Sequence, residues 1–273
     1  MRTKLQIVLI SLIVALGGFL FGFDAGIISG VMTYAGPEFD LTEIQVGWVV
    51  SSPSFAAMFS MLISGRISDI WGRRKLLVFI ALLYAVSAIL SALATSYEIL
   101  YIARIIGGLA FGAALVIAPM YIAEISTAEN RGKLVSLQQL NIVFGFFAAF
   151  LSNYLFNKYN TIDSNFLTDE NVWRWMLGIE LIPALLYFLL LFIVPKSPRW
   201  LYLNNQVSKA KKVLVNIYGY ERGELEIMSI EENNSVDKNK TKLKIKELFK
   251  PTLRFILFVG LIVGILQQIT GIN

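Results

Sequence analysis

The feature that most restricts the fold is a series of long apolar segments separated by short polar turns. We expect seven of them, at 5–28, 45–64, 76–94, 99–122, 134–156, 173–194 and 253–273. A membrane-spanning helix needs about 20 mainly apolar residues, because each residue adds about 1.5 Å across a hydrocarbon core about 30 Å thick. Hydrophobic residues make up 56% of the chain and charged residues only 16%, whereas soluble domains have about 25% charged residues. The sequence therefore predicts an all-α integral membrane protein.

The basic residues predict the orientation of these helices. Lysine and arginine precede the first segment, follow the second and the fourth, and number twelve within 195–250. The first intervening turn holds acids instead, namely Glu38, Asp40 and Glu43. Cytoplasmic loops are the ones enriched in lysine and arginine. We therefore expect a multi-pass protein of the cell membrane, with the lipid bilayer as its surroundings and with its amino terminus and 195–250 in the cytoplasm. The same loops explain the net charge of +5 without a nucleic-acid partner.

Residues 195–250 interrupt the apolar pattern with a long polar segment that has helical amphipathic character around Lys209. This order is typical of a transporter with two bundles of six helices: six apolar segments, then a large cytoplasmic loop, then a further apolar segment. We predict a six-helix transmembrane bundle at 1–194, a cytoplasmic loop with short amphipathic helices at 195–250, and the first helix of an incomplete second bundle at 251–273.

The residue types that are missing restrict the chemistry. The 273 residues include no cysteine and no histidine, which excludes thiolate and imidazole chemistry and cysteine-based metal sites. We see no phosphate-binding loop and no cluster of metal ligands, so we expect no enzyme, no metal and no cofactor. Any proton transfer near neutral pH must then use a carboxylate.

Two ionisable residues lie inside predicted helices, Asp24 in the first and Arg104 in the fourth. A charge in lipid costs at least ~2.5 kcal/mol, so both should face the protein interior and pair with each other. In the alternative interpretation, Arg104 reaches the outer surface and Asp24 caps a helix end. The interior interpretation makes Asp24 the best proton carrier, because a nearby arginine favours its ionised form and loss of that contact favours protonation.

Neutral amides also lie at membrane depth. They are Gln138 and Gln139 in the fifth segment and Gln267, Gln268 and Asn273 in the seventh. Each amide both donates and accepts hydrogen bonds, which suits a ligand with many hydroxyl groups. Hydrogen bonding between helices explains the same residues equally well.

Small residues and prolines predict how the helices pack. Glycines that recur every fourth residue allow close helix contact, and they are Gly18, Gly22, Gly26, Gly30, Gly108 and Gly112. Prolines inside three segments remove backbone hydrogen bonds and predict kinks, and they are Pro53, Pro119 and Pro183.

Taken in order, the polar motifs resemble the amino-terminal half of the sugar porter family of the major facilitator superfamily. These motifs lie at 22–30 (GFDAGIISG), 65–74 (GRISDIWGRR), 104–108 (RIIGG), 119–124 (PMYIAE) with Arg131 and Gly132, 195–201 (PKSPRWL) and 267–273 (QQITGIN). The resemblance implies a major facilitator fold, incomplete here with about seven of twelve transmembrane helices. It also implies secondary active transport of a monosaccharide, a hexose or a pentose, by alternating access.

The resemblance assigns roles to individual residues. Proton-coupled members pair an aspartate at the position of Asp24 with an arginine at that of Arg104, which implies sugar:proton symport. The sugar-contacting amides of the family correspond to Gln139, Gln267, Gln268 and Asn273. The cytoplasmic charge network, which latches the outward-facing state, corresponds to Asp69, Arg73, Arg74, Glu124, Arg131 and Arg199.

The sequence departs from the family pattern at three points. Lys196 stands where the family usually has glutamate, and Phe146 stands where some proton–xylose symporters have glutamine. The sequence also ends part-way through the sugar site, so the 273 residues alone are expected not to transport without the missing carboxy-terminal half. A facilitative sugar uniporter, a non-transporting sugar receptor and a truncated fragment remain as alternatives.

Overall fold

The computed structural model describes residues 2–127, 129–161, 167–238 and 251–269. The chain forms two compact units, Met1–Ile227 and Met228–Asn273. The boundary between them falls inside the predicted cytoplasmic loop, so residues 195–227 belong to the same unit as the preceding helices.

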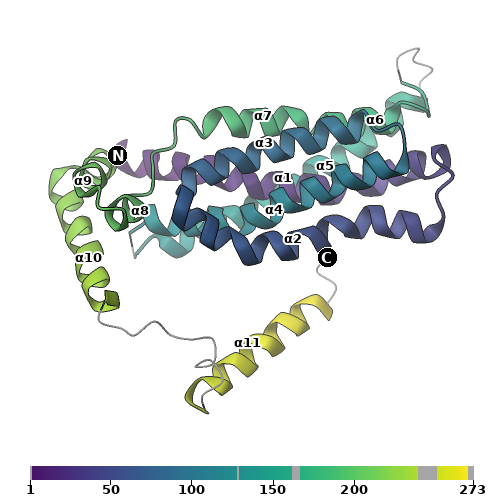
Figure 1. The fold of residues 1–273 in the computed structure, drawn as a ribbon. Helices are drawn as coiled ribbons and strands as arrows, with labels where there is room; N and C mark the ends of the chain where they lie inside the picture. The colour runs from purple at the N-terminus through teal and green to yellow at the C-terminus, as the bar shows by residue number, and fades with distance from the viewer. Residues whose placement is uncertain (1, 128, 162–166, 239–250, 270–273) are drawn as a thin grey trace. The chain divides into compact units, whose positions relative to one another are not determined.

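The first unit is built from five long helices and two shorter ones, α6 and α7, that run beside one another (Figure 1). They are α1 (Arg2–Glu38), α2 (Glu43–Trp71), α3 (Arg73–Ala92), α4 (Tyr97–Ile125), α5 (Arg131–Thr161), α6 (Val172–Gly178) and α7 (Leu181–Leu190). The shorter helices α8 (Pro198–Leu203) and α9 (Val207–Tyr218) follow, and α10 (Tyr220–Lys238) continues into the second unit. In the second unit the structure describes α11 (Pro251–Ile269).

Six segments within the described residues are long and apolar enough to cross a membrane. They are Leu5–Glu38, Glu43–Trp71, Arg73–Ala92, Tyr97–Ile125, Arg131–Asn160 and Val172–Leu190. These six confirm the first six predicted segments, although the first helix continues ten residues beyond the predicted end at 28. The apolar stretch in α11, Leu253–Leu266, is shorter, so the seventh crossing stays a prediction.

Glycines allow the closest helix contacts, as the sequence pattern predicted. A Cβ atom on Gly22 of α1 would lie 2.1 Å from the carbonyl oxygen of Ile142 on α5. A Cβ on Gly108 of α4 would lie 2.5 Å from the Cα of Pro53 on α2. Such distances are far below van der Waals contact, so only glycine permits these backbone approaches. Helix α1 is therefore held against α5, and α4 against α2.

The sixth crossing is interrupted at Ile179 and Glu180, between α6 and α7. Pro183 follows at the third position of α7 and has no N–H to donate to the carbonyl of Ile179. That carbonyl instead accepts from the N–H of Ile182 at 3.1 Å. The proline thus explains the irregular turn, and the turn places Glu180 inside the bundle, where it is only 4% exposed.

One end of the bundle is held by Arg174 at the start of α6. Its Nη2 lies 2.6 Å from Oε1 of Glu38 at the end of α1, and its Nη1 donates to the carbonyl of Ala94 after α3. The guanidinium carbon lies 4.2 Å from the ring centroid of Trp173, whose Nε1 also donates to Glu38. One side chain therefore joins three segments that are far apart in the sequence.

Replacing Arg174 with methionine is expected to lower the free energy of unfolding by about 1.5–3 kcal/mol, because charge-assisted hydrogen bonds at a half-buried site are lost. Arg222→Met is the matched control, since the Arg222–Glu129 pair is 3.2 Å apart and its side chains are 50% and 74% exposed. The control should cost about 0–1 kcal/mol. Equilibrium unfolding in mixed micelles measures both, and equal losses would contradict the role given to Arg174.

The helices after α7 pack against the same end of the bundle as the turn between α2 and α3. The hydroxyl of Tyr121 on α4 donates to the carbonyl of Pro195 at 2.8 Å. The hydroxyl of Tyr218 at the end of α9 donates to the carbonyl of Ile125 at the end of α4. Burial raises the pKa of Tyr218 to about 12, so this hydroxyl keeps its proton at neutral pH. Residues 195–218 are thereby fixed to α4.

Candidate functional site

An ion pair lies buried inside the bundle between α1 and α4. Nη1 of Arg104 contacts Oδ1 of Asp24, and the two side chains are 3% and 6% exposed. Gly22 and Gly26 flank Asp24 by two residues, which is about 200° around the helix. Because these glycines face α5, Asp24 faces away from α5 and toward α4. The pairing predicted from the sequence is therefore present.

A second carboxylate, Glu180, belongs to the same buried cluster. It interacts electrostatically with Asp24 and Arg104 from the break between α6 and α7. Tyr84 of α3 also interacts with both acids and is 1% exposed, and its hydroxyl donates to the carbonyl of Gly17 at 3.1 Å. Sequence analysis missed Glu180, although an acid inside the apolar segment 173–194 was a sufficient signal.

This cluster contains one permanent cation and two carboxylates. With both acids ionised it has one uncompensated negative charge, and a buried charge without a partner is costly. One proton on either carboxylate makes the cluster neutral. Nε of Arg104 has no hydrogen-bond partner among the described residues, so one N–H donor of the guanidinium is unused. Chemically, the arrangement can bind and release a proton.

The two neighbouring glutamines of α5 have opposite surroundings. Gln138 is 6% exposed, and its Oε1 has no hydrogen-bond partner in the described part of the chain. The side chain of Gln139 is exposed. Of the other predicted sugar contacts, Gln267 and Gln268 lie on α11 with side chains outside the described part, and Asn273 lies outside the described residues.

Aromatic rings lie near the buried pair, and sequence analysis did not single out most of them. Phe21 of α1 lies 4.7 Å from Phe111 of α4 and 6.4 Å, edge-on, from Phe146 of α5, measured between ring centroids. Phe146 also stacks on Phe150 at 6.4 Å. Phe21 precedes Asp24 by three residues and so occupies nearly the same face of α1. Rings of this kind can pack against the apolar faces of a sugar.

Three of the predicted latch residues form a charge cluster at the turn between α2 and α3. Arg73 is 6% exposed and lies 2.9 Å from Oδ1 of Asp69 and 2.9 Å from Oε1 of Glu124. The other oxygen of Glu124 accepts from the hydroxyl of Ser197 at 2.5 Å. This cluster joins α2, α3 and α4 to the segment before α8.

The remaining predicted latch residues have no ion pairs among the described residues. Arg74 donates to the carbonyls of Leu191 and Phe192 at 3.1 and 2.6 Å. Arg131 donates to the carbonyl of Ala123 at 3.2 Å. Arg199 is exposed. The predicted network is therefore assembled here around Arg73, and the other three arginines stay available to other partners.

Comparisons with known proteins identify the family of this chain. A sequence-family model described as "Sugar (and other) transporter" matches residues 10–273. The arabinose-proton symporter of Bacillus subtilis is 36% identical over 267 residues, which are 98% of this chain and 56% of that protein. The galactose-proton symporter of Escherichia coli is 35% identical over 265 residues, or 95% of this chain and 53% of that protein. This chain thus spans about half the length of the curated relatives it matches.

The fold has a close counterpart among solved structures. The partially occluded, inward-open xylose transporter XylE from E. coli matches with a TM-score of 0.82 and 30% identity, over 98% of this chain and 64% of that one. A second structure of XylE is described as a major facilitator superfamily proton:xylose symporter and matches with a TM-score of 0.81. From the family match, the relatives and the helical bundle, the chain belongs to the sugar porter family of the major facilitator superfamily.

Proposed function

We propose that this chain forms part of a monosaccharide transporter that is driven by protons and works by alternating access. The observation that carries the proposal is the buried cluster of Asp24, Arg104 and Glu180. A purely structural bundle gains little from such a cluster, because well-packed apolar residues are often as stable as a buried ion pair. Relatives named as arabinose-proton and galactose-proton symporters support the same proposal.

In this proposal Asp24 carries the proton. While Asp24 is ionised, Arg104 holds it in the ion pair. A proton arriving at Asp24 removes the charge, and Arg104 can then turn toward Glu180, which is already within electrostatic range. With Asp24 protonated, Arg104 and the ionised Glu180 balance each other, so the protonated bundle can change conformation without exposing an unpaired charge. Release of the proton on the other side of the membrane restores the original pair.

The sugar is proposed to bind between this bundle and a second one. Gln139 contributes an exposed amide from α5, and Gln267, Gln268 and Asn273 are proposed as further sugar contacts. Phe146, two turns beyond Gln139 on α5, and Phe21, which contacts Phe146, would supply an apolar wall. Arg73, Asp69 and Glu124 would close the cytoplasmic side when the site faces outward. The amino terminus and residues 195–250 are placed in the cytoplasm on the basis of their lysines and arginines.

Uptake of labelled sugars tests the proposal. The chain is expressed alone and joined to the second half of the arabinose-proton symporter, and uptake into energised cells is measured for a panel of hexoses and pentoses. The joined protein should accumulate a sugar above its external concentration. A sugar that only equilibrates would indicate a uniporter, and a sugar that binds without moving would indicate a receptor. Either result would overturn the proposal.

Gln139→Leu in the joined protein is expected to raise the apparent KM for the transported sugar about tenfold, because one hydrogen bond to a hydroxyl group is lost. Gln138→Leu is the matched control, because it removes the same amide group from the neighbouring residue, whose side chain is buried. The control should leave KM within about twofold, because the lost oxygen has no partner in the described structure. Initial uptake rates over a range of sugar concentrations give both values. Equal KM values for the two variants would remove Gln139 from the sugar site.

A further inference from the structure

Tyr84 of α3 carries a hydroxyl group in the interior of the bundle, beside the buried charge cluster. The residue is 1% exposed, and it interacts electrostatically with Glu180 and with Asp24. A phenylalanine would fill nearly the same space without a polar atom that needs a partner. Packing alone therefore does not explain a hydroxyl at this depth, and the proposed proton mechanism gives it no role.

Two hydrogen bonds join α3 to the helices that carry the buried ion pair. The hydroxyl of Tyr84 donates to the carbonyl of Gly17 on α1 at 3.1 Å. One turn further along α3, the hydroxyl of Ser87 donates to the carbonyl of Ala103 on α4 at 2.8 Å. Ala103 directly precedes Arg104. The same face of α3 is therefore fixed to α1 through Tyr84 and to α4 next to the arginine of the pair.

The hydrogen bond to Gly17 brings Tyr84 to the face of α1 that carries Asp24. Gly17 lies two turns before Asp24, and the two positions differ by only about 20° around the helix. Side chains of an α-helix lean toward its amino terminus, so the carboxylate of Asp24 extends back toward Gly17 and the Tyr84 hydroxyl. This placement explains why Tyr84 and Asp24 interact electrostatically.

Two acids, one arginine and one further tyrosine surround Tyr84 from the neighbouring helices. They are Asp24 of α1, Arg104 of α4, which pairs with Asp24, Glu180 between α6 and α7, and Tyr187 of α7. The basic residues of α3 itself lie at its start, and Lys75, the nearest of them, is about 13 Å away along the helix. The local charges that act on the Tyr84 hydroxyl are therefore those of the buried cluster.

The hydroxyl of Tyr84 offers the two acids an acceptor and no donor. A tyrosine hydroxyl has one proton, and Tyr84 uses it on the carbonyl of Gly17. An acceptor repels a carboxylate, whereas a protonated carboxyl group can donate a hydrogen bond to it. The oxygen of Tyr84 therefore favours the protonated form of the cluster over the fully ionised form.

We propose that Tyr84 is a positioning residue that sets the proton affinity of the buried cluster, by holding a hydrogen-bond acceptor beside Asp24 and Glu180. This inference rests on the proton coupling proposed for the chain. Arg104 favours the ionised form of Asp24, and Tyr84 acts in the opposite direction. The balance between these two residues then decides the pH at which the cluster takes up its proton.

Tyr84→Phe in the joined protein should move the pH midpoint of sugar uptake to lower pH by about 0.5–1 unit, because losing one acceptor lowers the proton affinity roughly three- to tenfold. Initial uptake rates of labelled sugar are measured over a range of external pH. The midpoint does not depend on how much protein reaches the membrane, so a loss of folded protein alone cannot shift it.

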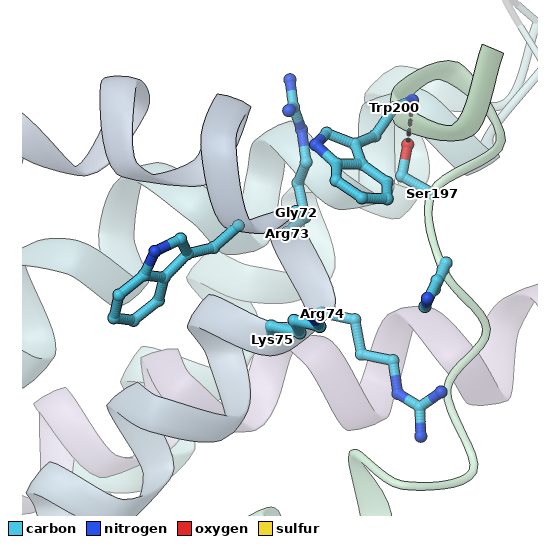
Figure 2. Close-up of a pocket in the computed structure, with 8 residues that line it drawn as sticks. Gly72, Arg73, Arg74, Lys75, Ser197 and Trp200 are labelled. Carbon is cyan, nitrogen blue, oxygen red and sulfur yellow. Dashed lines mark hydrogen bonds between the residues drawn. The ribbon is translucent and has the colours of Figure 1, made fainter. Parts of the chain in front are cut away.

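Tyr187→Phe is the matched control. Tyr187 is also buried, and its hydroxyl also donates to a carbonyl of α1, that of Val14 at 3.4 Å, but neither buried acid of the described chain acts on it electrostatically. A second control is Trp200→Phe, at the side chain that lies beside Gly72 at the turn between α2 and α3 (Figure 2). It removes the hydrogen bond from Nε1 to the carbonyl of Asp69. Both controls should keep the wild-type midpoint.

The outcomes separate this inference from the proposed function. An unshifted midpoint in Tyr84→Phe, or an equal shift in Tyr187→Phe, would overturn the role of Tyr84 while leaving proton coupling in place. Uptake by the wild-type joined protein that does not depend on pH would overturn both.

Discussion

Asp24→Asn is expected to abolish accumulation of sugar by the joined transporter while leaving its equilibration intact. Asparagine has nearly the shape of aspartate but cannot exchange a proton near neutral pH. With one proton per sugar, a driving force of 100 mV supplies about 2.3 kcal/mol, which corresponds to roughly 50-fold accumulation. The variant should fall to an internal-to-external ratio of about 1. Steady-state uptake of labelled sugar into energised cells measures the ratio.

Asp169→Asn is the matched control for this variant. Asp169 is exposed, and its carboxylate accepts a hydrogen bond from Asn160 at 2.6 Å. The same change of an acid to its amide should leave accumulation unchanged there. If Asp24→Asn still accumulates sugar as the wild type does, the proton is carried elsewhere, and Glu180→Gln becomes the next variant to measure.

Arg104→Gln is expected to destabilise the chain by about 3–5 kcal/mol. The change leaves Asp24 and Glu180 buried without their cation, and an uncompensated buried charge is the main cost of breaking such a pair. Adding Asp24→Asn to this variant removes one of the orphaned charges and should restore part of the lost stability. Equilibrium unfolding of the purified chain in mixed micelles measures the free energies for a double-mutant cycle.

Arg66→Gln provides the comparison for Arg104→Gln. Arg66 is exposed near the end of α2, so its loss should change stability by no more than about 0.5 kcal/mol. A double variant that is no more stable than Arg104→Gln alone would contradict the account of the buried pair. The loss would then come from packing of the long arginine side chain.

The sequence predicted the helices well because the membrane requires length and apolarity. It placed the end of the first helix at residue 28, whereas α1 continues to Glu38. The last turns of α1 leave the apolar pattern and hold serine, threonine and glycine, so hydropathy alone could not extend the helix. The division of the sixth crossing into α6 and α7 could not be predicted either. Pro183 indicates that the helix is disturbed, but it does not show whether the helix bends or breaks.

The sequence predicted site residues correctly where a single charged side chain occurs in an apolar segment. Asp24 and Arg104 stand alone in apolar segments, and the cost of burying one charge requires the other. Glu180 met the same criterion but was overlooked among apolar neighbours. The link from Arg174 to Glu38 depends on which helix ends meet, and that is a property of packing. The same holds for Arg74, which contacts carbonyl oxygens after α7 and no acid among the described residues.

Proton movement on addition of sugar is the most direct test of the central claim. Sugar is added to a lightly buffered, de-energised suspension of cells that contain the joined transporter, and the external pH is recorded. The proposal predicts that the medium becomes alkaline with the wild-type Asp24, because protons enter with the sugar, and that the Asp24→Asn variant gives no pH change while sugar still equilibrates. Sugar entry without alkalinisation in the protein that retains Asp24 would contradict proton coupling.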